Sequence, residues 1–168
     1  SLSWFRTEKR DLSLAQIHLS SMDTVDVALV LGFVSDFLKA EISNDFIRDH
    51  VNANPRRLIG FAGIDPTRGR CVQEIKRLQE EGFSGLVVSP ACQNFHPCDT
   101  RAMRIYEVAE ALKLPVYFLQ ADRFPTQARL EYANPVYLDE IARSFSQLRM
   151  VISNVGFPYS ETTIALLA

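Results

Sequence analysis

Short apolar runs alternate with longer amphipathic segments along most of the chain. The runs are rich in β-branched and aromatic side chains, which is typical of buried β-strands. Their first residues are 27 to 33 residues apart, an interval that fits successive strand–helix units. Five runs are therefore predicted to be strands: Val25–Leu31, Leu58–Ile64, Gly85–Ser89, Pro115–Leu119 and Leu148–Ser153.

The segments between these runs have apolar residues at helical spacing and recognisable helix ends. One helix is predicted to begin at Ser43 or Asn44, and its Phe46, Ile47 and Val51 are expected to face the core. The other helix signals are an opening segment over about Leu12–Met22, the stripe Cys71, Val72, Ile75 and Leu78 closed by Gly82, and starts at Thr100, Asn134-Pro135 and near Ser160.

Repeated alternation of strands and helices predicts a parallel sheet covered by helices. Strands such as Pro115–Leu119 are apolar on both faces, as buried parallel strands are. Two architectures fit this pattern: a barrel with helices on the outside, and a doubly wound sheet with helices on both faces. The pattern alone does not choose between them. At 168 residues the chain has the length of one domain.

Four segments resemble a known family: Asn44–Pro66, Glu80–Asp99, Leu114–Ala121 and Asn134–Pro158. The family is the amidohydrolase-related one, which contains metal-dependent hydrolases and carboxylic-acid decarboxylases built on a (β/α)8 barrel. The match extends from about Val25 to the last residue. The resemblance implies a single α/β domain over residues 1–168. Its fold would be a partial (β/α)8 TIM-type barrel, with about five sequential parallel strands and helices on the outer face.

The metal ligands of that family do not stand at the matching positions. In the family, the first strand ends in His-x-His, the fifth ends in a histidine and the sixth ends in His-x-Gly. By the resemblance, Leu119 stands at the fifth-strand position and Asn154 at the sixth, and the chain has no His-x-His. The family's aspartate on the eighth strand would lie beyond Ala168. Leucine offers no donor atom, so the family's divalent metal, such as zinc, is not expected as a cofactor.

These departures leave three interpretations of the function. The first is a hydrolase or decarboxylase relative that is catalytically degenerate, or a fragment of a full barrel. The second is a non-catalytic ligand-binding or regulatory module on the same fold. The third is a metal-independent enzyme that uses Asp65, His96 or Asp122 as an acid or base. Asp65 precedes a proline, however, and can equally form a turn.

Polar side chains follow the ends of several predicted strands. Because barrel active sites form at the carboxyl ends of the strands, these side chains are candidates for a ligand pocket. Half-exposed strand ends are also commonly polar without any ligand, so that alternative stays open. The candidates are Ser89, Gln93, Asn94, Gln120 and Asn154.

Three residues of metal-binding type, Cys92, His96 and Cys98, lie in one loop. Their C-x3-H-x-C spacing is not the C-x2-C pairing of structural zinc sites, and no fourth ligand is evident. Packing within the loop is therefore favoured over metal binding for these residues.

Charge and composition narrow the choice of partners. The net charge of −2 and the pI of about 5.9 do not favour binding to nucleic acid or to a membrane surface, both of which attract strongly basic proteins. The expected ligand is a small organic acid, as the family resemblance implies. Three cysteines without framework spacing are typical of reduced thiols, which predicts a cytoplasmic protein.

The predicted strand count also bears on assembly. Five sequential parallel strands form an arc, whereas the family's barrel closes with eight. The concave face of such an arc would be apolar and would have two unpaired edges. We therefore expect a homo-oligomer, or a cover formed by Ser1–Leu19, or completion by further segments.

Overall fold

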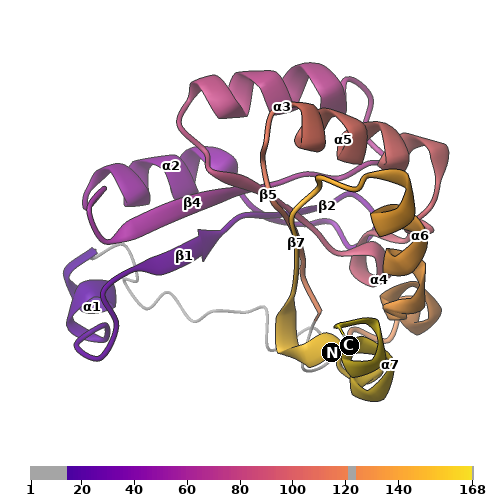
Figure 1. Ribbon diagram of the computed structural model, residues 1–168. Coiled ribbons are helices and arrows are strands. Elements are labelled where there is room, and N and C mark those ends of the chain that lie inside the picture. The colour runs from indigo at the N-terminus through magenta and orange to yellow at the C-terminus, as the bar shows by residue number, and fades with distance from the viewer. Residues whose placement is uncertain (1–14, 121–123, 168) are drawn as a thin grey trace.

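The computed structural model describes residues 15–120 and 124–167. Its centre is a curved sheet of five parallel strands in the order β1-β4-β5-β6-β7. This sequential order and curvature form an incomplete TIM-type barrel, which confirms the predicted fold class (Figure 1). The strands are β1 (Ala28–Leu31), β4 (Leu58–Gly63), β5 (Gly85–Val88), β6 (Val116–Phe118) and β7 (Met150–Ile152).

Helices cover the convex face of the sheet (Figure 1). The covering helices are α2 (Asn44–Asn52), α3 (Cys71–Glu80), α5 (Thr100–Ala111) and α6 (Val136–Ser144). Shorter or terminal elements are α1 (Ala15–Ser20), α4 (Pro90–Gln93), η1 (Leu130–Ala133), η2 (Ser153–Gly156) and α7 (Ser160–Leu167). Over the described ranges, none of these helices has the length and apolar character that a membrane crossing requires.

The hydrophobic core lies between the sheet and these helices. Alternate strand residues point into it, among them Leu86 of β5 and Phe118 of β6, and both side chains are buried. Ile75 of α3 and Ile105 of α5 meet them from the other side. The apolar stripe predicted for α3 is therefore confirmed as a core-facing stripe.

The concave face of the sheet is apolar and partly open. Phe61 of β4 and Tyr117 of β6 contact each other edge to face, with ring centroids 6.4 Å apart. Gly85 of β5 makes room for them, because a Cβ atom there would come 2.2 Å from the Phe61 ring. At the two edges, Leu29 is 45% exposed and Val151 is 38% exposed. In a closed barrel, side chains from further strands would fill this face.

The first strand is shorter than the predicted run Val25–Leu31, because it begins at Ala28. The Arg57 guanidinium donates to the carbonyl oxygens of Met22 and Val25 at 2.8 and 2.6 Å and holds this segment outside the sheet. The prediction is therefore wrong for the first three residues of the run. The other four strands lie within their predicted ranges.

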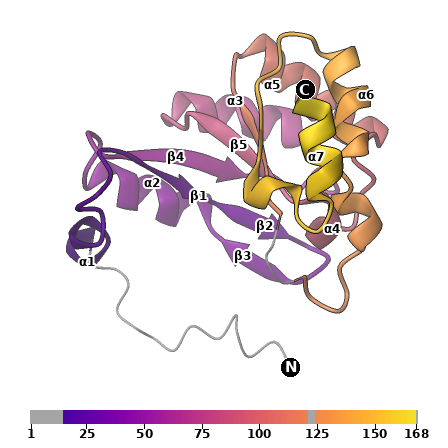
Figure 2. The ribbon, with the colours of Figure 1, turned by 60° about the horizontal axis from the view of Figure 1, so that its bottom comes forward.

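A small antiparallel hairpin was not predicted from the sequence. It consists of β2 (Phe33–Ser35) and β3 (Ala40–Ile42), with Val34 opposite Glu41. All three residues of β2 are buried, and β2 contacts both α4 and β4. Figure 2 shows the hairpin continuing beyond the end of β1 toward α4. It therefore packs beside the carboxyl ends of the strands, where barrel active sites form.

Several predicted helix ends are confirmed. The Ser43 hydroxyl accepts a hydrogen bond from the backbone N–H of Phe46 and caps α2, and Gly82 follows α3 with a left-handed φ of 95°. Ile47 is buried as expected. Phe46 is 49% exposed, so its predicted inward orientation is wrong; its ring stacks instead on that of His50, one turn along α2.

Candidate functional site

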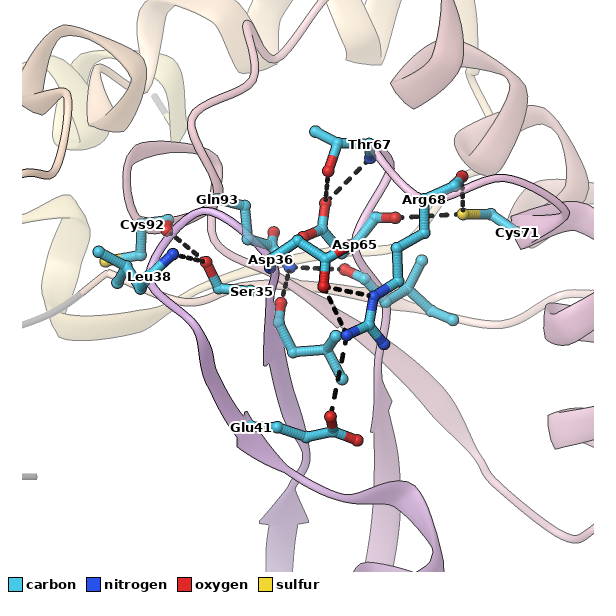
Figure 3. Close-up of polar contacts among 12 residues, drawn as sticks. Ser35, Asp36, Leu38, Glu41, Asp65, Thr67, Arg68, Cys71, Cys92 and Gln93 are labelled. Atoms are coloured by element: carbon cyan, nitrogen blue, oxygen red, sulfur yellow. Dashed lines mark hydrogen bonds and ion pairs between the residues drawn. The ribbon is translucent and has the colours of Figure 1, made fainter.

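Asp65 follows β4 at the carboxyl end of the sheet and is 2% exposed. Its Oδ1 accepts hydrogen bonds from the backbone N–H and the hydroxyl of Thr67, at 2.9 and 2.7 Å (Figure 3). Its Oδ2 accepts from the backbone N–H of Asp36 at 2.9 Å. The carboxylate therefore joins the loop after β4 to the turn of the β2–β3 hairpin. A general base needs an oxygen facing the substrate, and both oxygens here face the protein.

Gln93, at the end of α4, is 1% exposed and uses both ends of its amide. Its Oε1 accepts from the backbone N–H of Ser89 at 2.7 Å. Its Nε2 donates to the carbonyl oxygens of Val34 and Ile64, at 2.5 and 2.7 Å. One side chain thus connects the hairpin with the ends of β4 and β5. A buried amide that forms several hydrogen bonds to the backbone stabilises the fold.

Ser89 and Gln120 are also buried and engaged with the protein. The Ser89 hydroxyl donates to the carbonyl oxygen of Leu119 at 2.8 Å. The Gln120 side chain donates to the carbonyl oxygen of Ala133 at 3.0 Å, and its backbone N–H donates to the Ser153 hydroxyl at 2.6 Å. These bonds tie the ends of β5, β6 and β7 to one another.

Asn94 and Asn154 are the two predicted pocket residues that are exposed. Both have a left-handed backbone, with φ of 54° and 50°, which asparagine tolerates better than most residues. The Asn154 amide donates to the carbonyl oxygen of Gln120 at 2.6 Å. The Asn94 side chain forms no hydrogen bond with the described part of the chain. Three of the five predicted residues are therefore buried, and these two are exposed.

The loop after α4 packs as a local cluster. His96 Nδ1 accepts a hydrogen bond from the backbone N–H of Cys98 at 3.1 Å. The centroids of the His96 and Tyr137 rings are 4.4 Å apart. Burial raises the pKa of the Cys92 and Cys98 thiols, which disfavours the thiolate that a metal would need. Within residues 15–120 and 124–167, no three His, Cys, Asp or Glu side chains are arranged to hold a metal ion.

The two positions that the resemblance matches to the family's metal ligands do not suit zinc. Leu119 has no donor atom in its side chain, and its backbone N–H donates to the carbonyl oxygen of Val88 at 2.8 Å. The Asn154 amide nitrogen donates to the carbonyl oxygen of Gln120, and the amide oxygen, the atom that could bind a metal, is a poor ligand for zinc. Zinc sites use imidazole, thiolate or carboxylate ligands, so these two residues do not fit one. Asp122, the remaining predicted acid or base, lies outside the described residues.

Sequence reasoning missed the residues that the hairpin contributes (Figure 3). The buried Ser35 hydroxyl donates to the carbonyl oxygen of Cys92 at 2.8 Å. Arg68 contacts Asp36 at 2.7 Å, and this guanidinium lowers the pKa of the Asp36 carboxyl below its usual value. A second short apolar run directly after Val25–Leu31 was the available signal for this hairpin.

Comparisons with known proteins point to one family. The sequence profile described as amidohydrolase matches residues 21–168. The chain is similar to an uncharacterized TIM-barrel protein from Bordetella bronchiseptica, with 19% identity and a TM-score of 0.76 over 92% of this chain and 55% of that one. It is also similar to a 5-carboxyvanillate decarboxylase from Sphingomonas paucimobilis, with 19% identity and a TM-score of 0.64 over 83% of this chain and 51% of that one.

A third similar structure is a 2,6-dihydroxybenzoate decarboxylase from Rhizobium, with 15% identity and a TM-score of 0.62 over 84% of this chain and 55% of that one. The chain thus spans about half the length of these solved structures. The search of curated proteins gave no match. At these identities the structural likeness concerns the fold.

Proposed function

Because the chain belongs to the amidohydrolase family, we propose that it keeps the family's barrel scaffold without its metal-dependent chemistry and acts as a ligand-binding module. One observation carries this proposal: of the five predicted pocket side chains, all except Asn94 form hydrogen bonds within the protein. Every polar side-chain atom of Asp65 and Gln93 forms a hydrogen bond within the protein. Leu119 and Asn154 stand where metal ligands are expected. The ligand class is a small organic acid.

The activity test uses substrates named for the structural neighbours, 5-carboxyvanillate and 2,6-dihydroxybenzoate. The full chain, with added zinc or manganese, is expected to consume neither acid faster than buffer does. The double variant Leu119→His/Asn154→His is expected to be equally inactive, because two new imidazoles alone do not provide the usual three protein ligands.

Two results would overturn the proposal. Turnover that a chelator abolishes would establish metal chemistry. Turnover that persists with chelator and disappears in Asp65→Asn would instead establish a metal-independent acid–base enzyme.

We also propose that two copies associate through the concave face. Each of β1 and β7 has one neighbouring strand among the described residues, so both present a parallel edge. A two-fold axis along the strands would place β7 of one copy beside β1 of the other, twice. Leu29 and Val151, exposed on this face in a single chain, would then be covered.

Light scattering at micromolar concentration tests this assembly. The wild-type chain is expected to have the mass of a dimer, and Leu29→Lys/Val151→Lys that of a monomer. Ile164→Lys is the matched control, because Ile164 is also exposed but lies on α7. A wild-type monomer, or a double variant that remains dimeric, would contradict the proposal.

A further inference from the structure

A cleft of about 410 Å³ lies on the helix-covered side of the molecule. It is formed by the loop after β4, the first turn of α3 and the first turn of α5, two helices that pack side by side (Figure 1). This volume is within the range of small-molecule sites. The residues around it are Pro66, Thr67, Arg68, Gly69, Arg70, Cys71, Val72, Gln73, Arg101, Arg104 and Ile105.

The charged residues that line this cleft are all basic. Four of its lining residues are arginines and none is acidic. Two of the arginines are held by neighbouring carboxylates: Arg68 contacts Asp36 at 2.7 Å, and Arg101 contacts Asp99 at 3.0 Å. These two pairs fix the position of half of the basic lining.

Arg70 and Arg104 are the other half, and both are exposed. Neither side chain forms a hydrogen bond or ion pair with any residue in the described ranges. They come from different elements, because Arg70 directly precedes α3 and Arg104 lies in α5. A guanidinium can donate two parallel hydrogen bonds to the oxygens of one carboxylate or phosphate group. Two arginines in one cleft therefore suit an anion that carries two such groups.

The floor of the cleft is apolar. Ile105 and Cys71 are buried. The Cys71 thiol donates to the carbonyl oxygens of Asp65 and Arg68, and burial raises the pKa of this thiol to about 11. At neutral pH it is therefore a neutral thiol, and the cleft is suited to binding rather than to covalent chemistry.

We propose that this cleft binds a small organic anion carrying at least two carboxylate or phosphate groups, held between Arg70 and Arg104 over the apolar floor. The proposal places the ligand of the proposed binding module between the loop after β4, α3 and the start of α5, and not against Ser89, Gln93 or Gln120. It rests on the binding part of the proposed function and not on the absence of catalysis, so an activity assay and a binding assay can fail separately.

Isothermal titration of the full chain with citrate and with pyrophosphate tests this site and separates carboxylate from phosphate ligands. Saturable binding of at least one of them is expected. Arg70→Ala and Arg104→Ala should each weaken binding about tenfold, and the double variant about a hundredfold, because each removes a charge-assisted contact. Raising the salt concentration should weaken binding as well.

The matched control is Arg56→Ala/Arg143→Ala, which removes two exposed arginines outside the cleft. It changes the net charge equally and is expected to bind like wild type. Thermal unfolding confirms that each variant is folded. Absence of saturable binding of both anions up to about 10 mM would overturn the proposal. Equal weakening by the control pair and the cleft pair would also overturn it, because the effect would then come from overall charge.

Discussion

The strand ends and the arginine-lined cleft use polar side chains in opposite ways. At the strand ends, Asp65 and Gln93 are buried, and each bonds to several backbone groups from separate segments. In the cleft, Arg70 and Arg104 are exposed and form no bond within the described part of the protein. Buried polar side chains whose atoms all form hydrogen bonds stabilise the fold. Exposed charged side chains without an ion-pair partner are available to bind a ligand. Position at a barrel's strand ends is therefore not enough to identify a site.

The largest expected loss of stability is that of the Gln93→Ala variant. Gln93→Ala leaves the Ser89 N–H and the carbonyl oxygens of Val34 and Ile64 without their partner in the interior. Each unsatisfied buried group costs about 1 kcal/mol or more, so the free energy of unfolding should fall by about 3 kcal/mol or more. Urea unfolding measures this. Gln147→Ala, at an exposed glutamine, is the control and should change little. A loss below about 1 kcal/mol would mean that the hydrogen bonds of Gln93 do not hold the strand ends together.

A smaller loss, about 2 kcal/mol, is expected for Asp65→Asn. The variant replaces one acceptor oxygen with a donor, so either the Thr67 donors or the Asp36 N–H loses its partner. The same unfolding experiment gives the value. An unchanged stability would contradict the structural role and favour Asp65 as a functional group.

The Arg68–Asp36 pair links the two regions, and it should make stability depend on pH. Arg68 lowers the pKa of Asp36 in the folded protein, so the folded state binds this proton less readily than the unfolded chain. The contribution is present above the ordinary aspartate pKa and is lost as the pH falls through the lowered value. Because the pair is partly exposed, the effect should stay below about 1 kcal/mol. Unfolding measured from pH 6 to about pH 3 should show less acid destabilisation in Asp36→Asn than in wild type; equal curves would contradict it.

The smallest effect on stability is expected in the cleft. Arg70→Ala and Arg104→Ala should each change the free energy of unfolding by less than about 0.5 kcal/mol, because neither side chain has a partner to lose. Thermal unfolding without added anion checks this. A loss above about 1 kcal/mol would assign these arginines to the fold and remove the contrast with the strand ends.

Much of the fold could be predicted from the sequence, and the reason is visible in particular strands. Gly85–Val88 and Val116–Phe118 are buried on both faces or nearly so, and an apolar run flanked by helices carries that information locally. The hairpin could not be predicted in the same way. Its strands have three residues each, and Lys39 takes the left-handed conformation in its turn where a glycine or asparagine would have been a signal.

The site was harder to predict than the fold, for a related reason. Ser89, Gln93 and Gln120 were correctly placed at strand ends, but their partners come from elsewhere in the chain. The acceptor for Gln93 includes Val34 of the unpredicted hairpin, and the acceptor for Gln120 is Ala133 of η1. Whether a polar side chain faces a pocket or a carbonyl oxygen depends on these tertiary contacts. The arginines of the cleft form no local motif, because two lie in the loop after β4 and two lie in α5, about 30 residues later.

Measuring the metal content of the protein shows whether this barrel scaffold has lost the family's metal site. The full chain is incubated with zinc and manganese, freed of unbound metal, and subjected to elemental analysis. We expect far less than about one tightly bound ion per chain, because Leu119 and Asn154 stand at the positions that the resemblance matches to metal ligands. About one tightly bound ion per chain, reduced in Cys92→Ser/His96→Ala, would contradict this and place a metal centre at α4 and the loop after it.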